Sequence, residues 1–471
     1  MNKKNKVKKE LGDFQTPSYF TNIILEKLKN LGINASSIIE PTCGLGSFIL
    51  SASKIYPNAK IYGYDINQLY ISSLKKKLRD LNYKNIDISC SNFFDLNWDD
   101  IIKETSGELL IIGNLPWVTN STQGYLRTQN LPLKNNFLNY SGIDAITGKS
   151  NFDISEWMLI EILSWFKDKK GTIAMLVKES VARKVISYAK KQSNSLFQAS
   201  IYRINAKEIF NASVDACFMI LQLDSKKIPC YDYSIYNNME SSNSITMGNR
   251  DGLNISNLDD YEKYKYLLKK GGSKWRSGIK HDSSLIMELT RKEKGYINGY
   301  NEYIEVESDL LYPLMKGSDI GSNKDWRGKF ILVTQKFVGM DTAYIETAYP
   351  KIWNYLICHS DKLDFRASAI YKKNPRFSIF GVGDYSFKKW KIAICSLYKK
   401  LFFRLIGPIE GKCVQFDDTV YFISFDHKKD AIKALSYLES EDVQALLRSL
   451  IFWDDKRPIK TNILNLLNLK Q

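Results

Sequence analysis

A short apolar run that ends in Asn114-Leu115-Pro116-Trp117 is the feature that most restricts the fold of this chain. The run, Leu109 to Gly113, is bounded by turn-forming residues, which is typical of a strand buried in a parallel sheet. Open sheets of this kind bind ligands beyond the carboxyl ends of their strands. There the Asn114 amide oxygen and a backbone carbonyl can accept both hydrogens of an exocyclic amine, and the Trp117 ring can stack on the ring that carries the amine. We therefore expect a site for a nucleobase amino group at this edge.

A glycine turn earlier in the chain predicts a second part of the same site. The segment 37–48 has the pattern of a strand, a tight turn with Gly44 and Gly46, and the start of a helix. Glycines allow a ligand to approach the backbone closely. The next predicted strand ends in Asp65, nineteen residues after Gly46, a spacing that suits a carboxylate on ribose hydroxyls. Position 49 is Ile instead of the third glycine of a dinucleotide fingerprint, which disfavours NAD.

Together these segments resemble the S-adenosylmethionine-dependent amino-group DNA methyltransferases. The resemblance is strongest to the adenine-N6 enzymes of type II restriction-modification systems in which the target-recognition domain follows the catalytic domain. It implies an α/β fold, with a Rossmann-like doubly wound methyltransferase sheet and a C-terminal α+β target-recognition domain. It also implies S-adenosylmethionine as methyl donor, double-stranded DNA as partner, and a cognate restriction endonuclease encoded separately.

The resemblance assigns a role to each matching residue. The catalytic tetrapeptide is matched by Asn114, Leu115, Pro116 and Trp117, and the residues that would hold the donor are Thr16, Glu40, Gly44, Gly46, Asp65, Asn92 and Phe93. Phe210 stands where the family places an aromatic ring against the extruded base. Leu115 departs from the usual Pro, Trp117 from Tyr or Phe, and Asn92 from Asp. We expect an active enzyme with an altered affinity for the donor, because the Leu115 carbonyl and the Asn92 amide oxygen remain acceptors.

The expected chemistry is positioning of a weak nucleophile. Hydrogen bonds from the adenine amine to the Asn114 side chain and the Leu115 carbonyl would free the nitrogen lone pair, while Trp117 and Phe210 sandwich the base. A base inside a duplex cannot reach such a site, so the adenine must be flipped out. Cytosine N4, RNA and a protein glutamine remain alternative targets, and a non-catalytic DNA-binding subunit remains an alternative function. Because only thirteen residues precede Phe14, we expect no N-terminal nuclease domain.

Composition agrees with a nucleic-acid partner. Lys and Arg exceed Asp and Glu by 67 to 51, which gives a formal net charge of +16 and favours a polyanion. Seven Cys and three His form no Cys-X-X-Cys pair, so neither a metal site nor disulfides are expected. Cys43, Cys217 and Cys395 lie in apolar stretches and should be buried thiols. The chain has no apolar run of membrane-spanning length and no signal core, so we expect a cytoplasmic protein without a membrane partner.

Changes in composition and hydrophobic pattern along the chain predict three parts. Residues 1–10 should form a basic tail, residues 11–224 the methyltransferase domain, and residues 225–471 the target-recognition domain. The polar segment 119–151 should be a flap near the catalytic strand, and the segment 237–257 should form surface loops.

Several local predictions complete this division. The segment 366–391 is dense in basic and aromatic residues, and we expect Lys372, Lys373 and Arg376 to contact DNA. The regions 429–450 and 460–469 should be helices that pack. Thr16 and Asp153 each have an alternative interpretation as the N-cap of a helix.

Overall fold

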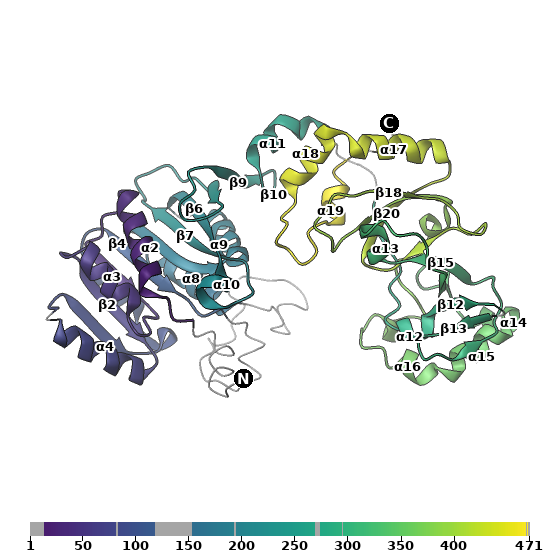
Figure 1. Ribbon diagram of the computed structural model, residues 1–471, viewed down its shortest axis with the longest axis horizontal. Coiled ribbons are helices and arrows are strands. Elements are labelled where there is room, and N and C mark those ends of the chain that lie inside the picture. Colours follow the sequence, from purple (N-terminus) through teal and green to yellow (C-terminus); the bar gives the residue numbers. More distant parts are fainter. Residues whose placement is uncertain are drawn as a thin grey trace. The chain divides into compact units, whose positions relative to one another are not determined.

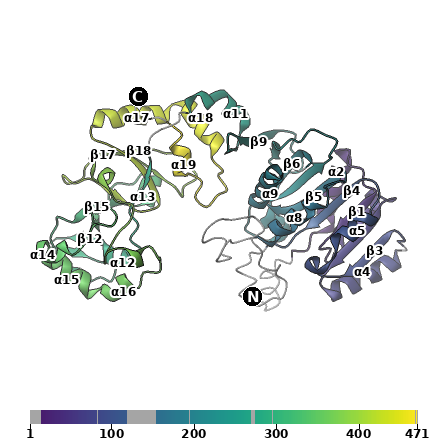
Figure 2. The same cartoon turned by 180° about the vertical axis from the view of Figure 1, so that it is seen from behind.

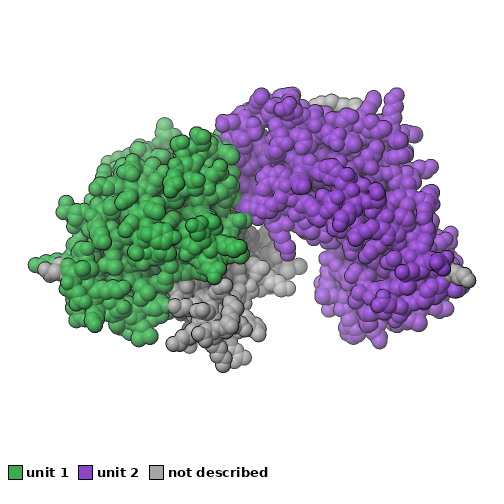
Figure 3. Space-filling view, viewed as in Figure 1, with its two compact units in different colours: residues 1–254 green, residues 255–471 purple. Residues whose placement is uncertain are grey.

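The computed structural model describes residues 14–81, 83–117, 153–192, 195–268, 274–293, 295–467 and 469. The expected basic tail and flap therefore lie outside the described residues. The chain divides into two compact units, residues 1–254 and residues 255–471, which are coloured separately in Figure 3. The division falls thirty residues after the predicted boundary.

The first unit is built on a ten-stranded sheet with the strand order β10-β9-β8-β6-β7-β5-β4-β1-β2-β3. Its strands are β1 (Ser37–Glu40), β2 (Lys60–Asp65), β3 (Ile86–Cys90), β4 (Leu109–Asn114), β5 (Gly171–Lys178), β6 (Leu196–Ile204), β7 (Ala216–Leu223), β8 (Tyr233–Tyr236), β9 (Ser244–Arg250) and β10 (Leu253–Ile255). The neighbours from β3 to β5 run parallel, whereas β7 is antiparallel to both β5 and β6. The carboxyl ends of β1, β2 and β4 therefore meet at one edge.

Helices cover both faces of this sheet, as expected for a doubly wound Rossmann-like fold. They are α2 (Ser18–Asn30), α3 (Ser47–Ile55), α4 (Gln68–Asp80), α5 (Trp98–Glu104), α8 (Ile154–Ser164), α9 (Glu179–Lys191) and α10 (Ala206–Phe210). Figure 1 shows α2, α3 and α4 on one face, and Figure 2 shows α5, α8 and α9 from the other side. Helices α2, α3 and α4 share one hydrophobic core with the sheet.

The strands β8 to β10 correct the prediction for the segment that follows residue 224. Strand β8 pairs with β6, and β9 pairs with β8, so this segment extends the sheet of the first unit. The predicted loop region 237–257 contains β9 and β10. Strand β9 is mostly exposed or half-buried. It lies next to the edge strand β10 and pairs through backbone hydrogen bonds, so a hydrophobic pattern does not reveal it.

The second unit is α+β, as predicted, with two smaller sheets. The orders are β14-β13-β12-β16-β15-β19 and β11-β20-β17-β18. Its strands are β11 (Arg276–Ser277), β12 (Glu288–Lys292), β13 (Gly295–Ile297), β14 (Tyr303–Ile304), β15 (Leu311–Met315), β16 (Lys329–Leu332), β17 (Trp390–Cys395), β18 (Arg404–Ile406), β19 (Gln415–Phe416) and β20 (Val420–Phe425).

The helices of the second unit are mostly short. They are α11 (Leu258–Tyr264), α12 (Ser284–Met287), α13 (Gly317–Gly321), α14 (Tyr344–Ala348), α15 (Pro350–Cys358), α16 (Ser360–Asp364), α17 (Lys428–Glu439), α18 (Glu441–Leu450) and α19 (Thr461–Leu464). The predicted region 429–450 is thus two helices that meet at Ser440, and α18 packs against α11. The predicted helix 460–469 is only the short α19.

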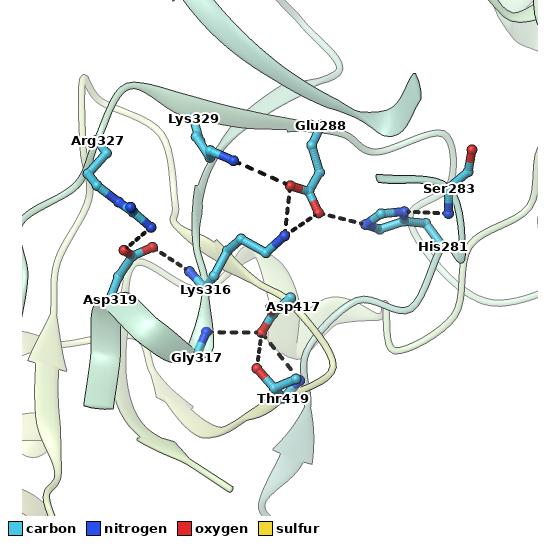
Figure 4. A network of polar contacts seen from close by, with 10 residues as sticks. All are labelled: His281, Ser283, Glu288, Lys316, Gly317, Asp319, Arg327, Lys329, Asp417 and Thr419. Atoms are coloured by element: carbon cyan, nitrogen blue, oxygen red, sulfur yellow. Dashed lines mark hydrogen bonds and ion pairs between the residues drawn. The ribbon is translucent and has the colours of Figure 1, made fainter. Parts of the chain in front are cut away.

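A buried polar network joins elements of both sheets in the second unit (Figure 4). The Glu288 carboxylate, at the start of β12, accepts hydrogen bonds of 2.8 and 2.9 Å from Lys316 Nζ. His281 Nε2 lies 3.5 Å from the same carboxylate. Asp417, between β19 and β20, accepts from Gly317 N and Thr419 Oγ1 at 3.2 and 2.6 Å. These bonds hold the end of β15 to both neighbouring segments.

Candidate active site

A cavity of about 240 Å³ lies at the carboxyl edge of the large sheet. Its walls come from the segment 14–16, the ends of β1, β2, β3 and β4, and the first two turns of α8. The lining residues are Phe14, Gln15, Thr16, Glu40, Pro41, Thr42, Cys43, Gly44, Ser47, Phe48, Asp65, Ile66, Asn67, Tyr70, Ser91, Asn92, Phe93, Phe94, Asn114, Pro116, Ile154 and Met158. The cavity therefore brings together eight of the predicted site residues from five separate segments.

The Asn114 side chain is held with its amide oxygen unpaired. Asn114 Nδ2 donates to the Phe14 carbonyl at 2.8 Å and to Thr16 Oγ1 at 3.3 Å. A carbonyl can only accept, so the atom that faces Phe14 must be the nitrogen. The opposite atom, Oδ1, is buried and has no hydrogen-bond partner among the described residues. An unpaired buried acceptor costs about 1–3 kcal/mol, so the site is arranged to receive an N–H donor.

The glycine turn after β1 has the conformation that its sequence requires. Gly44 and Gly46 have φ angles of +52° and +81°, in the left-handed region that favours glycine. A Cβ atom at Gly46 would lie 2.4 Å from Leu74 Cδ1. Gly46 is the N-cap of α3, so the turn leads directly into that helix.

Asp65 ties the end of β2 to the glycine turn. Its two carboxylate oxygens accept from Gly44 N and from Asn67 N, each at 2.8 Å. The carboxylate also lines the cavity, and carboxylate oxygens accept hydrogen bonds from hydroxyl groups. The predicted ribose acid is thus in the cavity and at the same time supports the turn.

Glu40 is a second acid at this edge, and it is nearly inaccessible to solvent. Burial, together with the nearby Asp65, raises the pKa of Glu40 well above its usual value, although a backbone hydrogen bond involving Ile49 lowers it. Its Oε2 atom has no hydrogen-bond partner among the residues described. Glu40 is therefore ready to interact with a hydrogen-bond donor or a cationic group in the cavity.

Three other predicted residues surround the cavity with defined contacts. Thr16 is buried and accepts from Asn114, and the N-cap of α2 is Pro17, so the alternative interpretation of Thr16 as a helix cap is wrong. Asn92 caps the short helix 93–95 through Phe94 N and donates to Asp95. The Phe93 ring is 5.0 Å from that of Trp98. The other candidate cap, Asp153, is confirmed as the N-cap of α8.

The aromatic sandwich expected around the base is not preformed. Trp117 is buried, and its Nε1 donates to the Leu176 carbonyl at 3.4 Å. The Phe210 ring meets the Trp117 ring edge to face, with centroids 5.2 Å apart. A purine does not fit between two rings in contact, so this arrangement differs from the predicted sandwich. Leu115 is buried, whereas Pro116 lines the cavity.

Sequence reasoning missed the contribution of Phe14. Its carbonyl orients the Asn114 amide, and its ring lies 5.4 Å from that of Trp117 and 6.2 Å from that of Phe210. Gln15 was also missed, although its side chain accepts from Leu45 N at 3.1 Å and covers the glycine turn. A main-chain acceptor leaves no sequence signal, because every residue has one.

The predicted DNA-contacting residues lie in the second unit and are exposed. Lys372 and Lys373 form part of a short 3₁₀ helix, and Arg376 follows it. Arg376 Nη2 is 2.8 Å from Asp364 Oδ2, so its charge is already compensated.

Two other cations of this basic segment are structural. Arg366 is buried, and its Nη1 donates to the carbonyls of His281 and Ser378. Lys391 is also buried and donates to the Ser386 carbonyl at 2.6 Å, and burial lowers its pKa to about 8. The density of basic residues in this segment therefore does not measure a DNA-binding surface.

The described residues contain no group of three or more His, Cys, Asp or Glu able to hold a metal ion. Within the same residues, no helix has both the length and the apolar character needed to cross a membrane. Cys43, Cys217 and Cys395 are buried and belong to no disulfide, as expected.

Comparisons with known proteins show the family of this chain. The N-6 DNA Methylase family model matches residues 1–266. Type II methyltransferase M.NspV from Nostoc sp. (strain ATCC 29411 / PCC 7524) is 48% identical over 470 residues, which cover 99% of this chain and 97% of the relative. Type II methyltransferase M.CvrRI from Paramecium bursaria Chlorella virus XZ-6E is 35% identical over 118 residues, 24% of this chain and 27% of the relative.

Among solved structures, an rRNA methylase from Streptococcus thermophilus matches 44% of this chain and 94% of its own, with 14% identity and a TM-score of 0.25. The assignment rests on the family model, which covers more than half of the chain, and on the nearly full-length similarity to the Nostoc relative. The chain therefore belongs to the N-6 DNA methylase family, and it is an S-adenosylmethionine-dependent DNA methyltransferase that acts on the N6 amine of adenine.

Proposed function

We propose that Asn114 is the catalytic residue and that its unpaired oxygen accepts a hydrogen of the adenine N6 amine. The observation that carries this proposal is the pair of hydrogen bonds that fix the Asn114 nitrogen toward Phe14 and Thr16. The oxygen is held before any ligand binds, so little reorganisation is needed when the amine arrives. The backbone carbonyl of Leu115 is the proposed second acceptor.

These two acceptors make the amine a better nucleophile. The N6 lone pair is delocalised into the purine ring, and hydrogen bonds to both N–H groups favour a tetrahedral nitrogen. The amine attacks the methyl carbon on the positively charged sulfur of the donor, so that the carbon–nitrogen bond forms as the carbon–sulfur bond breaks. The neutral thioether S-adenosylhomocysteine leaves, and the nitrogen loses one proton to solvent. The protein therefore needs no covalent intermediate and contributes positioning and electrostatics.

The donor fits the residues that line the cavity. We assign its binding to Thr16, Glu40, Gly44, Gly46, Asp65, Asn92 and Phe93. The unpaired Glu40 Oε2 atom supports this assignment, because a buried acid oxygen without a hydrogen-bond partner suits a donor group or a positive charge on the ligand. The Asp65 carboxylate suits the ribose hydroxyls, and the Phe93 ring forms an apolar wall.

A flipped adenine would reach this edge from duplex DNA. Stacking on an aromatic ring contributes about 1–3 kcal/mol per base, which offsets part of the cost of flipping. Since Trp117 and Phe210 are in contact, we propose that Phe210 moves aside when the base stacks on Trp117. The energy of an edge-to-face pair, about 0.5–1.5 kcal/mol, is small enough for this exchange.

We further propose that the chain is the modification enzyme of a type II restriction-modification system, with its endonuclease encoded separately. The name of the Nostoc relative supports this context. The expected cytoplasmic location also stays a prediction.

Base-resolution mapping of DNA from cells that express this chain tests the proposal. We expect N6-methyladenine at every copy of one short sequence, and none in cells that express Asn114→Ala. N4-methylcytosine in place of N6-methyladenine, or unmodified DNA with the wild-type chain, would overturn it.

A further inference from the structure

A turn after β16 presents two large apolar side chains to solvent. We call the residues Lys336, Phe337, Val338, Gly339 and Met340 the tip. Phe337 is 57% exposed and Val338 is 44% exposed. Single exposed apolar residues are common, but two neighbours at the end of a turn expose a continuous apolar surface.

The tip has a defined backbone. Met340 N donates to the Phe337 carbonyl at 3.2 Å, which closes a four-residue turn. Gly339 has a φ of +87°, the value that the third position of a type II turn requires. Lys336 N also donates to Met340 Sδ at 3.4 Å. Phe337 and Val338 are thus the first two residues of a formed turn.

Buried side chains fasten both ends of the tip. The Gln335 side chain donates to the Met340 carbonyl and accepts from Ile379 N at 3.0 Å. Thr334 Oγ1 donates to the Phe377 carbonyl at 2.8 Å. Because Thr334 and Gln335 are nearly inaccessible, these bonds are shielded from water, and the apolar residues cannot easily fold back onto the surface.

The surroundings of the tip carry exposed positive charge. Lys336 directly precedes Phe337. Lys372 and Lys373 lie just before the segment 377–379, whose backbone bonds Thr334 and Gln335. These three lysines form no ion pair with any residue that the structure describes. Of the acids in this part of the chain, Asp364 pairs with Arg376. The exposed Asp341 accepts from Ala343 N at 3.0 Å and keeps its charge, so the three lysines outnumber the one uncompensated acid named here.

We propose that the tip is a wedge, in which Phe337, supported by Val338, enters the base stack of bound duplex DNA. This inference rests on the proposed function, because it takes DNA as the partner of the second unit. Proteins that insert apolar side chains between base steps unstack them and kink the duplex by about 20–90°. A rigid apolar turn flanked by lysines has the chemistry for such a contact, since the lysines attract phosphates and the ring replaces a stacking partner.

Phe337→Ala in the full-length chain tests the wedge, with Tyr303→Ala as the matched control. Tyr303 is an aromatic residue of the same unit and is 53% exposed, but it lies on the edge strand β14. We expect Phe337→Ala to weaken binding to duplex DNA that contains the enzyme's target sequence about tenfold, because one stacking contact is lost. It should also reduce the DNA bend measured by fluorescence energy transfer between the duplex ends.

The salt dependence of binding separates the wedge from the charges around it. Phe337→Ala should leave the slope of log affinity against log salt unchanged, because an apolar contact releases no counterions. Lys336→Gln should reduce that slope by about 0.9. Phe337→Trp should restore both affinity and bend, which excludes a folding defect as the cause.

Three results would overturn the wedge. They are unchanged affinity and bend in Phe337→Ala, equal losses in Tyr303→Ala, and a change of oligomeric state in Phe337→Ala, which would make the tip a contact between copies of the chain. Failure of the proposed function has a different signature, because the wild-type chain itself would then neither bind nor methylate the duplex.

Discussion

The polar residues of the cavity in the first unit differ in hydrogen bonding from two carboxylates of the second unit. At the catalytic edge of the first unit, Glu40 and Asn114 each keep one buried oxygen without a partner among the described residues. In the network of Figure 4, Glu288 and Asp417 are buried to a similar degree but accept several hydrogen bonds. Paired groups of this kind hold a fold together, whereas unpaired groups at strand ends lower stability until a ligand binds. Unpaired buried atoms also occur in the second unit, Tyr371 Oη and Ser378 Oγ among them. The candidate ligand site is therefore marked by two such oxygens that lie together at strand ends in one cavity.

The largest expected effect is at the unpaired amide. Asn114→Ala should lower the single-turnover rate of methyl transfer about 10²–10³-fold, as loss of one well-placed electrostatic contact does. The dissociation constant of the methyl donor should change little, because Asn114 is assigned to the base. Quenched-flow transfer of a labelled methyl group, with donor binding by calorimetry, measures both. A rate near that of the wild type would show that the unpaired Asn114 oxygen has no function in methyl transfer, and the contrast with the paired network would lose its meaning.

Disrupting the hydrogen-bonded network around Glu288 should instead lower the free energy of unfolding. Burial raises the pKa of Glu288, but its hydrogen bonds with His281 and Lys316 outweigh burial and lower this pKa from 4.5 to about 2. A lowered pKa means that the carboxylate stabilises the folded state above about pH 4.5. That contribution, about 3 kcal/mol at most, is lost as the pH falls from 4.5 toward 2.

Glu288→Gln should remove this pH dependence together with the stability. Urea unfolding between pH 3 and pH 6 provides the measurement. Glu305→Gln is the control, since Glu305 is exposed in the same unit. If the free energy of unfolding of Glu288→Gln changed with pH as it does in the wild type, the ion pairs of Glu288 in Figure 4 would not contribute to stability.

Asp65 combines a structural role with a place in the candidate ligand site, because it supports the glycine turn and also lines the cavity. Asp65→Ala should weaken donor binding about 10- to 100-fold, the value of one or two charged hydrogen bonds. Asp87→Ala, on the neighbouring strand β3, should leave binding unchanged because Asp87 is exposed and outside the cavity. Calorimetric titration with donor compares the two variants, and equal dissociation constants would remove Asp65 from the donor site.

The smallest expected effects concern the surface charges of the second unit. Replacing both Lys372 and Lys373 with Gln should reduce the salt slope of DNA binding by about 1.8, if each lysine neutralises one phosphate. Arg376→Gln should change the slope less than one lysine does, because Asp364 already compensates its charge. Fluorescence anisotropy at several salt concentrations measures these slopes. A larger effect for Arg376 would show that DNA displaces Asp364.

The sequence could predict that these residues meet in one cavity because they stand at strand ends and in a glycine turn. In a parallel sheet these positions must meet at one edge, so Glu40, Asp65 and Asn114 could be placed together from spacing alone. The carbonyl of Phe14 could not be found in this way, since a main-chain acceptor is independent of residue type. Nor could the contact between Trp117 and Phe210, which depends on how two distant segments pack.

The second unit was harder to predict because composition does not determine exposure. Arg366 and Lys391 belong to a basic segment, yet both are buried and donate to backbone carbonyls. Long cationic side chains can donate hydrogen bonds to the backbone carbonyls of buried loops as well as bind phosphates. The first compact unit extends beyond residue 224 for a related reason, since the strands β8 and β9 join its sheet through backbone hydrogen bonds.

The central claim is that the Asn114 oxygen binds the adenine amine, and a double-mutant cycle between protein and DNA tests it most directly. The wild type and Asn114→Ala are each titrated with a duplex that contains the target adenine and with one that contains purine, which lacks the amine, at that position. Differences in base pairing are common to both proteins and cancel in the cycle. We predict a coupling energy of about 1–3 kcal/mol between the side chain and the amine. A coupling energy near zero would contradict the account.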